Sequence, residues 1–162
     1  MWMQWTVITI GVVLMVGRLI QVWSRGHRAR GRWQRAVEAC EKGDLAAAEA
    51  DLRKVVGLMP IWAPARRVLG ATLAGRGRFA EAEEQFRMAA QLEPRNGTAH
   101  WDLGMFLASC PPQRPEEAIE AFERAIEFAP DLRQTLGQFD QLAPLRAFER
   151  FRGLLPPGDT DA

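Results

Sequence analysis

The side chains that could do chemistry in this 162-residue sequence are few and scattered. The histidines His27 and His100 stand at no spacing from a serine, cysteine or carboxylate that would make a catalytic triad, a metal site or a phosphate-binding loop. The cysteines Cys40 and Cys110 lie in different predicted helices, unlike the close pairs of zinc sites or dense disulfide frameworks. We therefore expect no catalytic residue, no metal and no cofactor, and we interpret both cysteines as reduced, half-buried thiols.

Two groups of glutamates could supply the paired carboxylates of general acid–base catalysis. They are Glu81, Glu83 and Glu84, and then Glu116, Glu117 and Glu120. Arginines follow both groups at helical spacing, and such a pattern is typical of a solvated helix face with ion pairs. The sequence therefore predicts a protein that is not an enzyme.

The overall charge excludes a general attraction to nucleic acid. Lys plus Arg number 21 and Asp plus Glu number 20, which leaves a net charge of +1. With 48% hydrophobic and 25% charged residues, the composition is that of an ordinary folded protein. Any function that needs positive charge must be local.

An apolar segment near the N-terminus has the length of a membrane-spanning helix. Residues 6–17 are uncharged and rich in Val and Ile. As a helix, residues 2–23 would rise about 33 Å, close to the ~30 Å thickness of the hydrocarbon core. Arg18 could extend its guanidinium to the interface, and tryptophans flank the run as in the aromatic belts of membrane helices. Those tryptophans are Trp2, Trp5 and Trp23. We predict a transmembrane anchor over residues 1–23.

Two other interpretations of this segment stay open. A cleaved signal peptide carries positive charge before its apolar core, but residues 1–17 contain no Lys or Arg. A helix of a soluble core is the second alternative, because the charge-free run is shorter than about 18 residues and Arg18 interrupts it.

The next segment, residues 24–35, holds five arginines and one histidine with no acid. The positive-inside rule then predicts that everything after the anchor faces the cytoplasm. The composition, rich in Ala, Arg and Gly, favours a bacterial inner membrane. This basic juxtamembrane segment could attract anionic lipid headgroups through Arg25, Arg28, Arg30 and Arg32. We expect no nucleic-acid partner.

The rest of the chain repeats itself with a period of about 34 residues. Small and apolar residues recur at spacings of four and three, which is one face of a helix. The triplets are Ala48, Leu52 and Val55; Ala82, Phe86 and Ala89; and Ala118, Phe122 and Ala125. A proline follows each triplet after five residues: Pro60, Pro94 and Pro130. A second helix is predicted before each triplet, marked by Ala36, by Leu69-Gly70 and by Leu103-Gly104.

This pattern resembles the tetratricopeptide repeat, a helix–turn–helix unit with these small, aromatic and proline positions. The resemblance implies an all-α chain: a transmembrane helix, an α-solenoid of about three hairpins, and a C-terminal cap. The three repeats would be residues 29–62, 63–96 and 97–132, the first being the weakest match. Residues 131–155 are predicted to form two capping helices broken at Ala143-Pro144, and residues 156–162 a disordered tail.

In tetratricopeptide repeats the first helices of the hairpins line a concave groove that holds a peptide or a helix. Carried over to this sequence, the groove would be Trp33, Val37, Cys40, Arg67, Ala71, Ala74, Trp101, Met105 and Ala108. Arg67 could anchor an acidic group or a carbonyl of the partner. Whether Trp33 and Trp101 are exposed in the groove or packed under neighbouring helices stays open. Binding of chaperone C-terminal tails is disfavoured, because Val37 and Ala71 stand where that subtype needs asparagine.

We therefore expect a membrane-anchored scaffold or assembly factor that binds another protein through the groove. One alternative is a receptor or chaperone-like module for client polypeptides, similar to import receptors. Another is a periplasm-facing assembly protein similar to those of cytochrome maturation, which the arginine-rich flank argues against.

Overall fold

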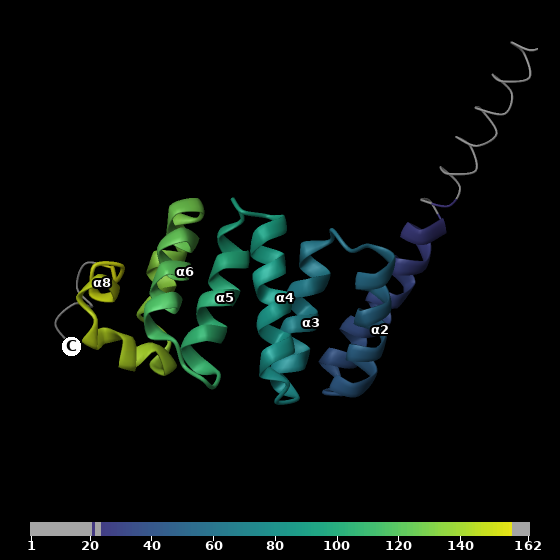
Figure 1. The fold of residues 1–162 in the computed structure, drawn as a ribbon, viewed down its shortest axis with the longest axis horizontal. Helices are drawn as coiled ribbons and strands as arrows, with labels where there is room; N and C mark the ends of the chain where they lie inside the picture. The colour runs from purple at the N-terminus through teal and green to yellow at the C-terminus, as the bar shows by residue number, and fades with distance from the viewer. Residues whose placement is uncertain (1–20, 22–23, 157–162) are drawn as a thin grey trace, which may run out of the picture. The chain divides into compact units, whose positions relative to one another are not determined.

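The computed structural model describes Gln21 and residues 24–156, and every regular element in these ranges is helical (Figure 1). The predicted all-α class is confirmed for this part of the chain. No helix in these ranges combines the length and the apolar character needed to cross a membrane. The predicted anchor, apart from Gln21, and the predicted tail after Pro156 lie outside the described residues. The chain divides into two compact units, Met1–Pro60 and Ile61–Ala162.

The first unit contains one helical hairpin. A helix over residues 24–41 is followed by α2 (Leu45–Leu58). Gly43 turns the chain with a φ of 74°, in the left-handed region that glycine adopts without strain. The side chain of Asp44 then caps α2, accepting a hydrogen bond from the amide of Ala47 at 3.0 Å. The buried side of the hairpin is apolar, with Ala36, Ala48, Leu52 and Val55 fully buried.

The second unit begins with two hairpins. The first pairs α3 (Ala63–Gly75) with α4 (Phe79–Leu92), and the second pairs α5 (Gly97–Ser109) with α6 (Pro115–Phe128). The hairpins stack through α4 and α5, and α3 also contacts α5. These are tetratricopeptide-like hairpins, as the repeat pattern predicted.

A glycine in the first helix and a phenylalanine in the second hold each of these hairpins together. A Cβ at Gly70 would lie 3.1 Å from the ring of Phe86, and a Cβ at Gly104 would lie 2.9 Å from the ring of Phe122. Real Cβ contacts are essentially never as short as the one at Gly104 and are rarely as short as the one at Gly70, so glycine lets each ring pack closely onto the opposite backbone. The recurring Leu-Gly and Phe positions of the sequence are thus two sides of one contact.

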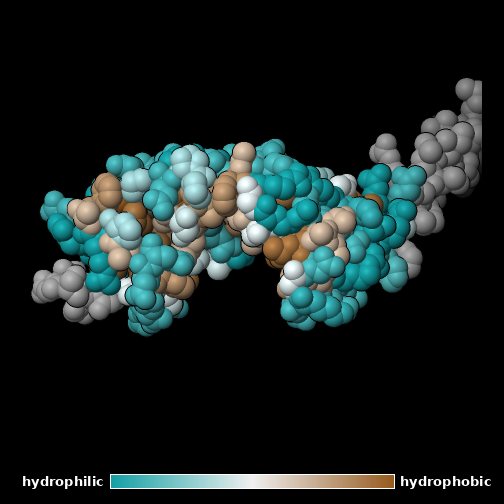
Figure 2. Space-filling model, turned by 90° about the horizontal axis from the view of Figure 1, so that it is seen from below, coloured by the Kyte–Doolittle hydropathy of each residue, from teal (hydrophilic) through white to brown (hydrophobic). Residues whose placement is uncertain are grey.

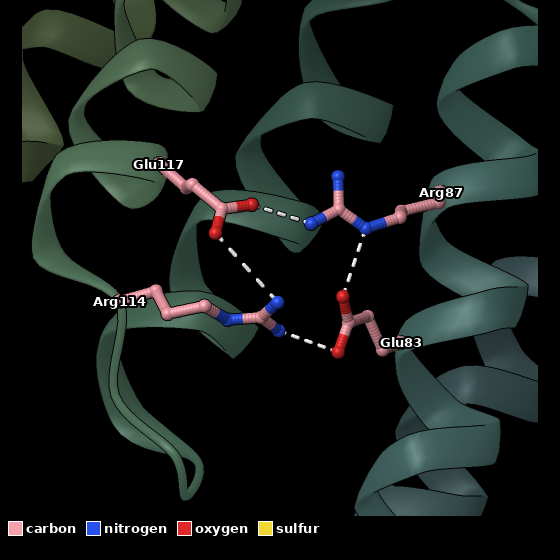
Figure 3. Close-up of polar contacts among 4 residues, drawn as sticks. All are labelled: Glu83, Arg87, Arg114 and Glu117. Carbon is pink, nitrogen blue, oxygen red and sulfur yellow. Dashed lines mark hydrogen bonds and ion pairs between the residues drawn. The ribbon is translucent and has the colours of Figure 1, made fainter.

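An ion-pair ring joins α4 of one hairpin to α6 of the next (Figure 3). Glu83 accepts from Arg87 at 2.8 Å and lies 2.5 Å from Arg114, and Glu117 accepts from Arg87 at 2.5 Å and lies 3.7 Å from Arg114. The hydrogen bond from Arg114 holds the pKa of Glu83 below its ordinary value, and Arg87 adds to this effect. Of the six glutamates in the two groups, Glu81, Glu83 and Glu117 form ion pairs in the described chain, and Glu83 and Glu117 connect neighbouring hairpins.

The C-terminal segment differs from the two helices that the sequence predicted. It forms four short helical pieces: η1 (Pro130–Leu132), α7 (Arg133–Leu136), η2 (Asp140–Ala147) and α8 (Glu149–Arg152). Pro144 lies inside η2, where its missing amide hydrogen prevents a regular α-helix. The segment still buries apolar side chains, among them Leu136, Leu142, Leu145 and Phe151. It covers the last hairpin, because η2 contacts α5 and the ring of Phe151 lies 6.2 Å from that of Phe122.

Hydrophilic residues cover much of the visible surface of the second unit, with apolar residues in separate patches among them (Figure 2). The large apolar side chains exposed in that unit are Ile61, Leu92, Phe128 and Phe139. Contiguous exposed apolar side chains often mark a protein-binding surface.

Candidate protein-interaction site

Three of the nine predicted groove residues lie in the first unit. Trp33, Val37 and Cys40 all belong to the helix over residues 24–41, and all three are half-buried. Each has part of its surface available on that helix.

The other six lie in the second unit, on the two helices that begin its hairpins. From α3 come Arg67, Ala71 and Ala74, and from α5 come Trp101, Met105 and Ala108. Since α3 contacts α5, the structure brings these two groups together on adjacent helices. We call these six residues the interaction face. Ala71 is exposed, and the other five are half-buried.

An ion pair that the sequence analysis missed crosses this face. The Nε of Arg67 on α3 donates to Oδ2 of Asp102 on α5 at 2.5 Å, and both side chains are less than a third exposed. Arg67 is therefore already neutralised by its own chain, unlike the cationic anchor that we expected. Asp102 lies 35 residues after Arg67, about one repeat, so the repeat period itself would have indicated a neighbouring position.

Part of the Trp101 side chain packs against other aromatic rings of the protein. Its ring meets that of Phe122 on α6 edge-on at 5.3 Å, and the ring of Phe139 lies 5.9 Å away. Phe139 precedes η2, so the C-terminal segment covers one side of this tryptophan.

The arginines of the basic segment, residues 24–35, fall into two groups in the structure: those that pair with Asp51 and the others, whose side chains are exposed. Arg32 donates to Asp51 of α2 at 2.8 Å, and Arg35 donates to the same carboxylate at 3.1 Å. The hydrogen bond from Arg35, with that from Arg32, lowers the pKa of Asp51 below its ordinary value. These two arginines therefore stabilise the first hairpin. The exposed side chains of the segment include Arg25, Arg28 and Arg30.

The groups considered for catalysis are held in structural roles. His100 is buried, and its Nε2 lies 2.9 Å from the carbonyl oxygen of Pro94, which can only accept a hydrogen bond. Burial raises the pKa of the Cys110 thiol, which disfavours the reactive thiolate. In the ranges that the structure describes, no three His, Cys, Asp or Glu side chains form a group that could hold a metal ion.

The comparison with family models matches the tetratricopeptide repeat over residues 113–132, which include all of α6. A comparison with curated proteins found no match.

Solved structures with the same fold cover most of this chain. One is a mutant O-GlcNAc transferase of Thermobaculum terrenum, which is 25% identical to this chain and superimposes with a TM-score of 0.64. The match covers 77% of this chain but only 23% of the length of that enzyme. The MamA protein is 20% identical with a TM-score of 0.64, over 80% of this chain and 70% of MamA.

A third similar structure contains a bound peptide. The first tetratricopeptide domain of Spaghetti (RPAP3), bound to an HSP90 peptide, is 20% identical with a TM-score of 0.63, over 79% of this chain and 94% of that one. The family model thus identifies one tetratricopeptide repeat at residues 113–132, and the solved structures show that the described chain has a tetratricopeptide-like fold.

Proposed function

We propose that this protein is a membrane-anchored scaffold or assembly factor that binds a segment of another protein on the interaction face. A tetratricopeptide-like fold supports a protein-binding role in general, and one similar domain was solved with a peptide bound. The observation that carries the proposal is the chemistry of the face between α3 and α5.

That chemistry suits an apolar segment. The only charged member of the face, Arg67, is matched by Asp102, so the face offers no unbalanced charge of its own. Ala71 and Ala74 leave space above α3, and Met105 adds a flexible apolar side chain on α5. An amphipathic helix or an extended segment could place its apolar side chains there.

A photocrosslinking experiment in cells that produce the full-length chain tests this proposal. A benzoylphenylalanine at Ala71, which is exposed on the face, should crosslink to discrete polypeptides other than the chain itself. The matched control replaces Ala80, an exposed alanine of α4 outside the face, and should not produce these products. Adding Met105→Glu to the Ala71 variant should abolish them, because a carboxylate would have to be desolvated in the interface. The same products from both positions would contradict the proposal.

The cellular location is part of the proposal. The Trp-flanked apolar segment would anchor the chain in a bacterial inner membrane, and the arginines that follow it would keep the repeats in the cytoplasm. An added attraction to anionic headgroups would come from the exposed side chains of Arg25, Arg28 and Arg30. Arg32 is instead paired with Asp51. Protease added to spheroplasts should leave the repeat domain intact. Its digestion from outside would favour the periplasm-facing alternative.

A further inference from the structure

A cavity lies on a different side of α5 from the interaction face. It has a volume of about 430 Å³ and is lined by residues of α4, α5 and α6, which lie next to one another in Figure 1. Ligand pockets have volumes of about 300–1,000 Å³. From α5 it receives His100 and Leu103, whereas Trp101 and Met105 of the interaction face point elsewhere on the helical wheel.

The residues that line the inner part of this cavity are buried, and one of them is fixed by a hydrogen bond. Leu103 and Ala90 are buried, and the His100 ring is fixed by its hydrogen bond to Pro94. The ring of Phe128 lies 6.0 Å from the His100 ring and remains 37% exposed. This phenylalanine therefore presents an uncovered aromatic surface at the edge of a preformed recess, which an apolar side chain could bury.

Two hydrogen-bond donors beside this recess are unused. In the described part of the chain, the guanidinium of Arg124 and the amide of Gln91 make no hydrogen bond or ion pair. Arg87, which also lines the cavity, is bonded to Glu83 and Glu117. Arg124 is thus the cation of this cavity whose donors are available, and a guanidinium fits a carboxylate best because it can donate two parallel hydrogen bonds.

The cavities next to this one indicate where an acidic group of a ligand could lie. A smaller cavity of about 80 Å³ adjoins the first one and shares several lining residues with it. Its charged lining is Arg87, Arg124, Glu117 and Glu120, so it offers a carboxylate no net positive charge. On the other side, Pro94 and Phe128 also line an open hollow of about 680 Å³. A bound polypeptide could therefore extend from the cavity into this hollow beside Phe128, with its acidic side chain near Arg124 and Gln91.

We propose that this cavity, named here the α4–α6 pocket, binds a partner polypeptide through an apolar side chain next to an acidic one. The apolar side chain would pack on Leu103 and Phe128, and the carboxylate would accept hydrogen bonds from Arg124 and Gln91. The site uses none of the six residues of the interaction face, so it stands or fails independently of the proposed function.

Nuclear magnetic resonance of the full-length chain tests this site with blocked dipeptides. N-acetyl-Leu-Asp-amide should shift the signals of Leu103, His100 and Phe128 in a saturable way. N-acetyl-Leu-Asn-amide has nearly the same shape without the charge, and N-acetyl-Gly-Asp-amide has the charge without the apolar side chain. Both should bind about tenfold more weakly or worse, since a charge-assisted hydrogen bond and a buried leucine side chain each contribute about 1.5 kcal/mol or more.

Two surface variants on α6 separate recognition from folding. Arg124→Gln should weaken the binding of N-acetyl-Leu-Asp-amide about tenfold with an unchanged melting temperature. Glu127→Gln should strengthen it, because Glu127 lines the same cavity and repels the carboxylate. Lys54→Gln, which changes an exposed lysine of α2 in the first unit, is the matched control and should have no effect.

Three results would overturn the proposal. Equal binding of the Asp and Asn dipeptides would show that no carboxylate is recognised. Shifts centred on Trp101 and Met105 would place the binding on the interaction face. Unchanged affinity in both Arg124→Gln and Glu127→Gln would remove the proposed ion pair.

Discussion

Arg67 on α3 and Asp102 on α5 form a 2.5 Å ion pair across the face where the sequence alone suggested a free arginine. The pair joins the first helices of two neighbouring hairpins, and both side chains are shielded from much of the solvent. It therefore contributes both to the stacking of the hairpins and to the neutral character of the interaction face.

A double-mutant cycle should detect this ion pair. We expect Arg67→Ala and Asp102→Ala to show a coupling free energy of about 1 kcal/mol, because a partly buried pair is screened less than a surface pair. Urea unfolding of the wild type, the two single variants and the double variant gives the value. Strict additivity of the two changes would mean that the pair does not form in solution.

Trp101→Ala should lower the free energy of unfolding by about 2 kcal/mol. The change removes the aromatic contacts to Phe122 and Phe139, and a half-buried tryptophan loses less than one in the centre of a core. Met105→Ala, the comparison on the same face, should cost less than Trp101→Ala. Thermal and urea unfolding measure both. If Trp101→Ala leaves stability within about 0.5 kcal/mol of the wild type, the tryptophan serves binding alone.

Gly104→Leu should destabilise the protein by about 3 kcal/mol or more. Even a Cβ at this position would lie 2.9 Å from the ring of fully buried Phe122, which has no free space to move into. The control is Gly57→Ala in α2, where a Cβ meets nothing within 4 Å and alanine favours the helix. That variant should be as stable as the wild type or slightly more stable. An unchanged melting temperature for Gly104→Leu would contradict the α5–α6 packing.

The contribution of Glu83 to stability should depend on pH in a defined direction. Its pKa in the folded protein is lowered below the ordinary 4.5, chiefly by the hydrogen bond from Arg114, so its ionised form stabilises the fold. This contribution is complete above about pH 4.5 and is lost as the pH falls through the lower folded pKa. The difference in unfolding free energy between wild type and Glu83→Gln, about 1 kcal/mol at pH 7, should therefore shrink in acid.

The neighbouring Glu84 gives the control for this titration. It is exposed on the same helix and forms no ion pair in the described chain. Glu84→Gln should leave the unfolding free energy at pH 7 close to that of the wild type. A loss equal to that of Glu83→Gln would indicate a general charge effect in place of the ring in Figure 3.

The N-terminal segment should keep the full-length chain in membranes during alkaline carbonate extraction. Its Trp-flanked apolar run has the length of a bilayer span. A variant that lacks residues 1–23 should appear in the supernatant. Release of the full-length chain would contradict the anchor.

The sequence by itself determined the helical hairpins of the repeat region, because their signals are local. Spacings of four and three residues follow from helix geometry, and Gly43 and Gly77 mark turns because only glycine accepts their φ of 74° at low cost. The Gly104 and Phe122 positions were also predictable, because the family pattern encodes the close approach of two helices.

Only the tertiary structure decided how the polar and aromatic side chains pair. Arg67 with Asp102 and Trp101 with Phe139 are contacts between residues more than thirty positions apart, and their geometry depends on how hairpins and the C-terminal segment stack. The same holds for Arg114, which lies in the turn before α6 and meets Glu83 of the preceding hairpin. Hydrophobic periodicity identifies which face of a helix is buried, but the partner of each side chain is set by the packing of elements that the periodicity does not place.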